Sequence, residues 1–175
     1  EPVNEVSAGE RGQADALTTL IEFERSATAI TDVSPLLVPG LMQTTEYARI
    51  VLGRATDVET RAAVRVGRRE VITRRRDPVQ YTALLLESVL YQQIGGDIMA
   101  DQLRLICTLA DLPNVCVRII PDAAGITRAH MGSFVLLEFA KADPIVHVEH
   151  LSTTAFLRDR ADVEAHKGAR ADLEQ

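Results

Sequence analysis

The hydrophobic positions in the first half of the chain recur mainly at helical spacing. Residues 10–25 place Leu17, Leu20 and Ile21 on one face, which predicts a helix, whereas residues 1–9 lack periodicity and predict a disordered lead-in. An extended piece over 27–33 follows. Two further helices are predicted over 44–53 and over 58–76, the second ending before Pro78.

From residue 81 the pattern changes to that of strands. Residues 81–90 form a nearly continuous apolar run, which is typical of a central strand that is buried on both faces. The remaining predicted elements are a helix over 97–111, a strand over 115–120, a hairpin of strands over 133–140 and 145–151, and a polar helix over 159–173.

This order of elements predicts an α+β fold, or a mixed α/β fold, for a single domain over residues 10–175. Helices would pack on a mixed sheet of about four to five strands, and the N-terminal part would be helical. If the strands over 81–90 and 115–120 lie in one sheet and are parallel, the connection through the intervening helix should be a right-handed crossover.

One segment, residues 35–49, joins an apolar stretch to a helix start through the dipeptide Pro39-Gly40. Proline fixes φ and glycine accepts positive φ, so this dipeptide predicts a tight turn, and Thr44 is placed to cap the following helix. A buried structural turn explains the segment, and contact with a partner or an effector is the alternative. The candidate residues for either role are Pro39, Gly40, Leu41, Gln43 and Tyr47.

Arginines are concentrated in one predicted helix. Residues 61–76 contain seven arginines and one glutamate, in a chain whose net charge is −6. Three interpretations are open: a secondary contact to DNA, a docking face for an acidic partner, or solvation and pairing within the chain. The candidate partner-binding residues are Arg61, Arg65, Arg68 and Arg69.

Three glutamates, Glu87, Glu138 and Glu149, fall inside apolar strands, where a carboxylate is costly unless it is paired or lies at an edge. They could form a carboxylate cluster for acid–base chemistry, or simply occupy edges and pair with arginines. His147 and Glu149 share a strand face, but two ligands do not make a zinc site. No nucleophile elbow and no phosphate-binding loop is present, so we predict no enzyme activity, no metal and no cofactor.

Composition narrows the picture further. Tryptophan is absent and aromatic residues make up 4%, which predicts an aliphatic core, and no apolar run reaches the ~20 residues of a spanning helix. The negative net charge disfavours non-specific binding to nucleic acid or to anionic membranes. Cys107 and Cys116 are predicted to be buried free thiols, which fits a cytoplasmic protein.

Several motifs resemble those of one family, the C-terminal domain of actinobacterial, antitoxin-like helix-turn-helix regulators. That family is characterised by Pro-x-Leu-Val-Pro-Gly-Leu-Leu-Gln-Thr followed by an acidic residue, Tyr and Ala, and this chain departs from it only at Met42. The matching segments are 35–48, 81–90, 95–103, 112–121 and 132–139.

The resemblance implies a regulatory domain, without catalysis, whose Xre-type helix-turn-helix is absent from this fragment and alone contacts DNA. It also implies a protein partner, either a small protein encoded by a neighbouring gene or a second copy of the chain, and no membrane. The alternative is an effector-sensing domain of the same regulator. Its pocket would use Glu87, Arg118 and His147 as polar anchors.

Overall fold

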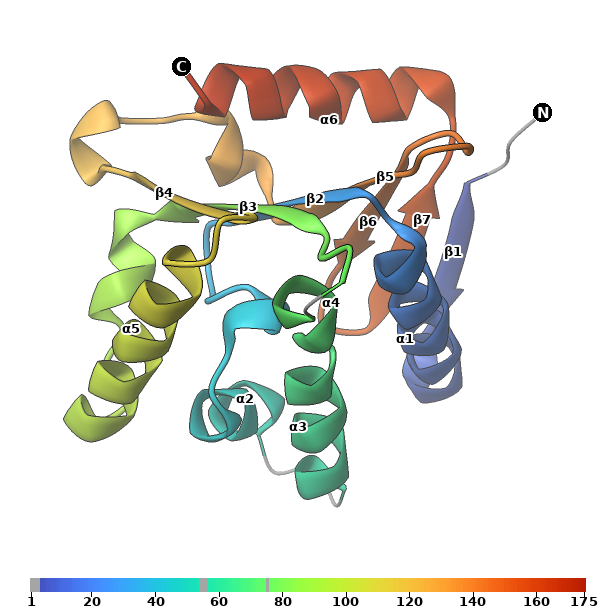
Figure 1. The fold of residues 1–175 in the computed structure, drawn as a ribbon. Helices are drawn as coiled ribbons and strands as arrows, with labels where there is room; N and C mark the ends of the chain where they lie inside the picture. The colour runs from blue at the N-terminus through green and yellow to red at the C-terminus, as the bar shows by residue number, and fades with distance from the viewer. Residues whose placement is uncertain (1–3, 54–56, 75) are drawn as a thin grey trace.

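A seven-stranded sheet organises the molecule (Figure 1). The computed structural model describes residues 4–53, 57–74 and 76–175. The strands lie in the order β1-β7-β6-β5-β2-β3-β4. Their bounds are β1 Glu5–Ala8, β2 Ala29–Ser34, β3 Gln80–Leu86, β4 Val115–Ile120, β5 Phe134–Glu138, β6 Ile145–Glu149 and β7 Thr153–Leu157.

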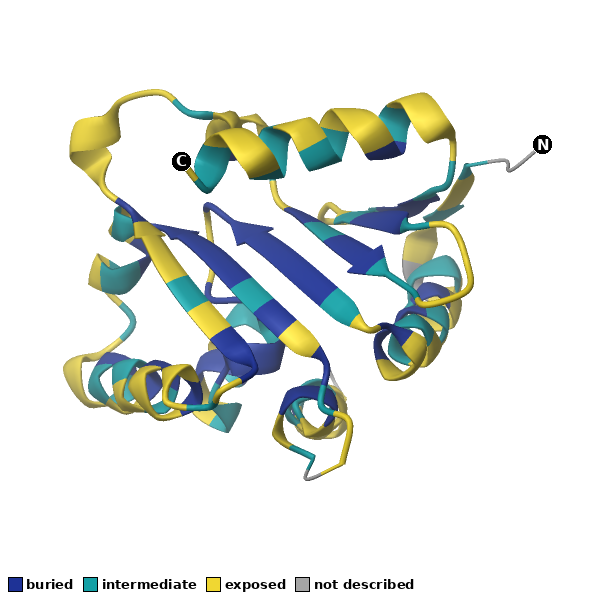
Figure 2. Ribbon diagram, turned by 45° about the horizontal axis from the view of Figure 1, so that its top comes forward, coloured by how far each residue is buried: buried dark blue, intermediate teal, exposed yellow. Residues whose placement is uncertain are grey.

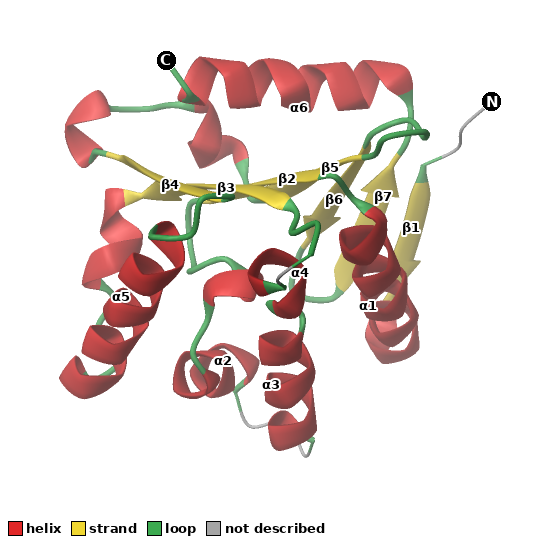
Figure 3. Cartoon of the chain, viewed as in Figure 1, coloured by secondary structure: helices red, strands yellow, loops and turns green. Residues whose placement is uncertain are grey.

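Helices cover both faces of this sheet unequally: α1 to α5 lie on one face and α6 lies on the other (Figures 1 and 3). Their bounds are α1 Gly9–Ser26, α2 Thr45–Leu52, α3 Val58–Gly67, α4 Glu70–Thr73, α5 Gly96–Ala110 and α6 Arg160–Leu173, with short 3₁₀ turns η1 Gly40–Met42, η2 Glu87–Tyr91, η3 Asp122–Ala124 and η4 Arg128–Met131. Within the described ranges, no helix has the length and apolar character needed to cross a bilayer.

The sheet combines two directions. β2, β3 and β4 are mutually parallel, so the strands around residues 81 and 115 share one sheet, while β5 pairs antiparallel with both β2 and β6. β6 therefore runs in the same direction as β2. The carboxyl ends of β2, β3, β4 and β6 consequently lie at one edge of the sheet.

The core is mostly aliphatic, although Tyr47, Tyr81, Phe134 and Phe156 are also buried in it, and the central strands are the most deeply buried (Figure 2). Leu84, Leu85 and Leu137 have no exposed surface. The prediction of two buried thiols is wrong, since Cys107 and Cys116 are both exposed. The first lies on the outer side of α5 and the second on the edge strand β4.

The prediction of four to five strands is too low. Five extended segments were predicted, and β1 and β7 are the two that were missed. β1 lies in the predicted lead-in and offers one large apolar side chain, Val6, which is itself exposed. β1 is formed by pairing with β7. Backbone hydrogen bonding to a neighbour, rather than a local hydrophobic pattern, defines this strand.

Two predicted elements are shorter than expected. The helix over 58–76 is divided into α3 and α4 at Arg68 and Arg69, and Arg75 lies outside the described residues. The strand over 81–90 ends at Leu86, and Glu87 begins η2. Val89 of η2 is also buried, so the sequence stays apolar beyond the end of the strand. Periodicity alone does not distinguish these two conformations.

Candidate functional site

The segment with the Pro-Gly turn, residues 35–44, connects β2 to α2 and is termed the Pro-Gly segment. It passes beneath the sheet between α3 and α5, and Leu41, Met42 and Gln43 are almost completely buried. A buried loop must find hydrogen-bond partners for its backbone groups. The surrounding side chains provide these partners.

Side chains from within the segment and from α5 hold its backbone. Val38 donates its amide to Tyr47 Oη at 3.0 Å, and Gln43 Nε2 donates to the Val38 carbonyl at 2.7 Å. Gln102 on α5 donates to the Met42 carbonyl at 2.7 Å and accepts from the Thr44 amide at 2.8 Å. These contacts explain why tyrosine and glutamine accompany the Pro-Gly turn.

Arginines from the other predicted site meet the same segment. Arg69 Nε donates to the Leu41 carbonyl at 3.1 Å, and its Nη2 donates to the Gln43 carbonyl. Arg65 Nη1 donates to Gln43 Oε1 at 3.4 Å. The structure thus brings together the Pro-Gly and arginine candidates, and of the four arginines only Arg61 is exposed.

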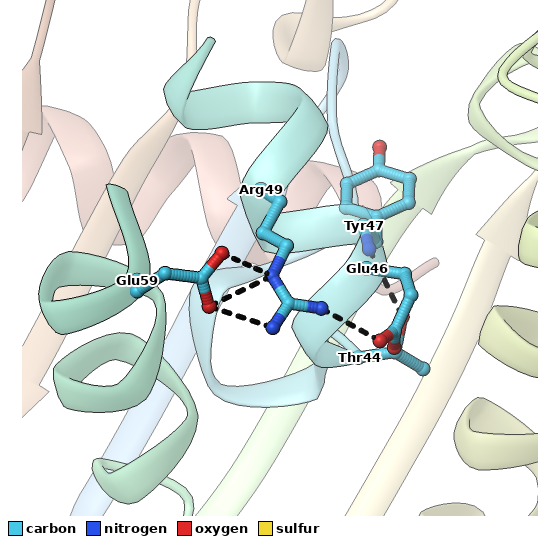
Figure 4. A network of polar contacts seen from close by, with 5 residues as sticks. All are labelled: Thr44, Glu46, Tyr47, Arg49 and Glu59. Atoms are coloured by element: carbon cyan, nitrogen blue, oxygen red, sulfur yellow. Dashed lines mark hydrogen bonds and ion pairs between the residues drawn. The ribbon is translucent and has the colours of Figure 1, made fainter. Parts of the chain in front are cut away.

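The start of α2 is fixed as predicted and is tied to α3 (Figure 4). Thr44 Oγ1 accepts from the Tyr47 amide at 3.2 Å, which makes Thr44 the N-cap. Arg49 donates to Glu59 on α3 at 2.6 Å and to Glu46 at 2.9 Å. Both pairs are exposed, so their contribution to stability is small and they mainly orient the two helices.

The same segment presents two leucines to solvent. Leu36 and Leu37 are 70% and 42% exposed. Gln92 Nε2 donates to the Leu36 carbonyl and Gln92 Oε1 accepts from Tyr47 Oη at 2.6 Å. Tyr91, next to Gln92 in the chain, is 66% exposed. Leu36, Leu37 and Tyr91, hereafter the apolar patch, therefore extend from a hydrogen-bonded support.

A second group of polar side chains is buried between the sheet and α3. Arg68 forms an ion pair with Glu24 of α1 at 2.6 Å, and these side chains are only 11% and 2% exposed. On β2, Asp32 accepts from Ser34 Oγ at 2.6 Å and from Tyr81 Oη at 3.3 Å. Arg68 is the cation that offsets the charge of both carboxylates.

Burial shifts two titrating groups in opposite directions. It raises the pKa of Asp32 to about 6, although the hydrogen bond from Ser34 and the charge of Arg68 oppose the rise. Burial also lowers the pKa of His147 to about 4, and Arg68 adds to this effect. His147 Nε2 lies 2.8 Å from Thr154 Oγ1, which itself donates to the Val148 carbonyl. The neutral ring therefore carries its hydrogen on Nε2.

The three predicted pocket anchors do not come together. His147 is buried on β6 under α1 and α3, whereas Arg118 is exposed on the edge strand β4. Glu87, the first residue of η2, accepts a hydrogen bond from the Asp122 amide at 2.9 Å. Glu138 pairs with Arg170 of α6 at 3.0 Å, which is the arginine pairing considered for the strand glutamates. In the described parts of the chain, no three His, Cys, Asp or Glu residues are arranged to hold a metal ion.

Sequence reasoning missed Glu24 and Asp32, although both left a signal. Glu24 lies four residues after Leu20, on the apolar face of α1. Asp32 is a charged residue within a strand that is otherwise composed of uncharged residues. A charged residue on an apolar face predicts a buried partner. The partner, Arg68, lies 44 positions from Glu24, so no local pattern could have identified it.

The fold and this arrangement define a mixed α+β protein with buried polar side chains beneath a mixed seven-stranded sheet. The chain belongs to a family described as a domain of unknown function, DUF5753, whose model matches residues 17–175. Comparisons with curated proteins and with solved structures found no match.

Proposed function

We propose that this domain is the regulatory part of an actinobacterial, Xre-type DNA-binding regulator, and that it acts in the cytoplasm by binding a protein partner. Its DNA contacts would come from a helix-turn-helix outside this fragment. The resemblance of the Pro-Gly segment to antitoxin-like regulators favours this class. The partner we propose is the small protein that the resemblance places beside such regulators.

The apolar patch is the observation that carries the proposal. Large apolar side chains on a rigid support are a favourable binding surface, because little conformational entropy is lost when a partner covers them. The patch lies where β2 and β3 end, the edge at which sheets of this kind commonly bind other molecules.

Only two of the four candidate arginines support this proposal. Arg68 pairs with Glu24 and Arg69 binds backbone carbonyls, which supports the interpretation of pairing within the chain for these two. Arg61 and the half-buried Arg65 remain candidates for steering an acidic partner.

Native mass spectrometry tests the proposal. The domain is expressed alone and together with the protein of the neighbouring gene, and both samples are measured at the same concentration. We expect a defined heterocomplex in the second sample. A spectrum that contains only free domain, or only a dimer of the domain, would overturn the proposal as stated.

A second candidate, effector sensing, is favoured by one observation. Arg68 and Glu24, which are largely buried, also line an open groove between α1 and α3. A signal that enters there would reach the Pro-Gly segment through Arg68.

A further inference from the structure

The groove between α1 and α3 has a volume of about 260 Å³. Ile21 of α1 and Val64 and Val71 from α3 and α4 form its apolar walls. Drug-sized ligands occupy about 300–1,000 Å³, so this space suits a smaller metabolite. This space is hereafter called the α1–α3 groove.

Charges of both signs line the α1–α3 groove in equal number. Glu24 and Arg68 form the buried pair, and Arg25 and Glu70 lie at the exposed positions. Neither Arg25 nor Glu70 forms an ion pair with another described residue. Arg68 uses Nε and Nη2 for Glu24, which leaves its Nη1 donors for another acceptor.

This balance selects the chemistry of a ligand. A simple anion would be repelled by the carboxylates of Glu24 and Glu70. A simple cation would be repelled by the guanidinium groups of Arg25 and Arg68. A molecule that carries both a carboxylate and an ammonium group can bind the two arginines through the carboxylate and the two glutamates through the ammonium group. An apolar side chain on the same molecule would be buried against the valines.

We infer that the α1–α3 groove binds a small zwitterion, an α-amino acid with an apolar side chain. The carboxylate accepts hydrogen bonds from Arg68 Nη1 and Arg25, and the ammonium group donates to Glu24 and Glu70. This inference rests on the effector-sensing candidate and is independent of the protein partner.

The position of Arg68 gives such a ligand a route to the Pro-Gly segment. A Cβ atom at Gly40 would lie 3.6 Å from Arg68 Nη1, the atom that the ligand engages. A ligand that draws Arg68 toward the groove would therefore alter the contact between α3 and the turn.

Isothermal titration calorimetry with L-leucine, L-valine, L-methionine and L-phenylalanine tests the inference directly. The decisive comparison is between L-leucine and its two fragments, 4-methylpentanoic acid without the ammonium group and 3-methylbutylamine without the carboxylate. We expect at least one of the four amino acids to bind. For leucine, each fragment is expected to bind about tenfold more weakly or worse.

Two variants locate the site. Arg25→Gln and Glu70→Gln change exposed residues and should leave the fold intact, yet each should weaken binding about tenfold, while Glu22→Gln on the outer side of α1 should not. Amide shifts at Gly67 in NMR spectra would confirm the location. The inference is overturned if no amino acid binds at millimolar concentration, if 4-methylpentanoic acid binds as well as leucine, or if all three variants behave alike.

Discussion

The ion pair between Arg68 and Glu24 is the residue-scale feature on which the arrangement of α1 and α3 depends. Two charges buried together lose hydration, and their mutual attraction offsets this loss only when the geometry is favourable. Here the contact is bidentate, since Arg68 Nε and Nη2 reach separate Glu24 oxygens at 2.9 and 2.6 Å. Removing Glu24 takes away the hydrogen-bonded partner of Arg68 and leaves this buried guanidinium with only the more distant charges of Glu149 and Asp32.

Glu24→Gln should therefore lower the free energy of unfolding by about 3–5 kcal/mol. Urea denaturation at pH 7 measures the change. The matched control is Glu59→Gln, which breaks the exposed pair with Arg49 and should change stability little. Equal effects of the two substitutions would show that burial does not increase the contribution of the Arg68–Glu24 pair to the free energy of unfolding.

Asp32 and His147 give opposing contributions to the dependence of stability on pH. Between pH 4 and 6 the folded chain retains the Asp32 proton that the unfolded chain has lost, so Asp32 lowers stability as the pH rises. Between pH 4 and 6.5 the unfolded chain protonates His147 while the folded chain keeps it neutral, so His147 raises stability as the pH rises. The two contributions largely cancel.

Single substitutions should reveal each contribution. Relative to the parent chain, Asp32→Asn should gain about 3 kcal/mol of stability between pH 4 and 6, and His147→Gln should lose a similar amount between pH 4 and 6.5. Urea midpoints at several pH values measure both slopes. Profiles that stay parallel to the parent profile would contradict the assigned pKa values of these groups.

At the scale of elements, the Pro-Gly segment is a loop held as firmly as a strand. Gln102 carries much of this constraint, because its amide binds backbone groups on both sides of Gln43. Helical periodicity predicted α1, α2 and α5 because each has a regular apolar face, and α6 was predicted as a polar helix. The break between α3 and α4 could not be predicted, since it depends on contacts of Arg68 and Arg69 with distant parts of the chain.

Gln102→Met should destabilise the domain by about 1–3 kcal/mol, because it leaves a buried carbonyl and a partly buried amide unpaired at similar side-chain volume. Gln93→Met is the control, since Gln93 is exposed and binds only the nearby Tyr91 carbonyl. Thermal and urea unfolding both measure the difference. If the two variants unfold together, the segment is not held through Gln102.

At the scale of the whole molecule, the hydrophobic pattern was sufficient for the fold class but not for the site. The β5–β6 hairpin was predicted, because a short turn makes the two strands that it joins antiparallel, whereas the direction in which β3 pairs with β4 was not predicted. The buried polar group combines residues from four separate parts of the chain: Glu24 of α1, Asp32 of β2, His147 of β6 and Arg68 between α3 and α4. Only the packing of α1 and α3 beneath the sheet brings these residues together.

The whole-molecule account makes the Pro-Gly segment a scaffold that presents the apolar patch to a partner. Leu36→Asp should therefore weaken the partner complex strongly without unfolding the domain. Leu151→Asp changes a fully exposed leucine in the β6–β7 turn and should leave binding unchanged.

The most direct measurement is the dissociation constant of the complex with the neighbouring-gene protein for the parent chain and these two variants, with unfolding curves recorded in parallel. The account predicts at least a tenfold weaker complex for Leu36→Asp alone, at unchanged stability. Equal affinity of Leu36→Asp and the parent chain would contradict it.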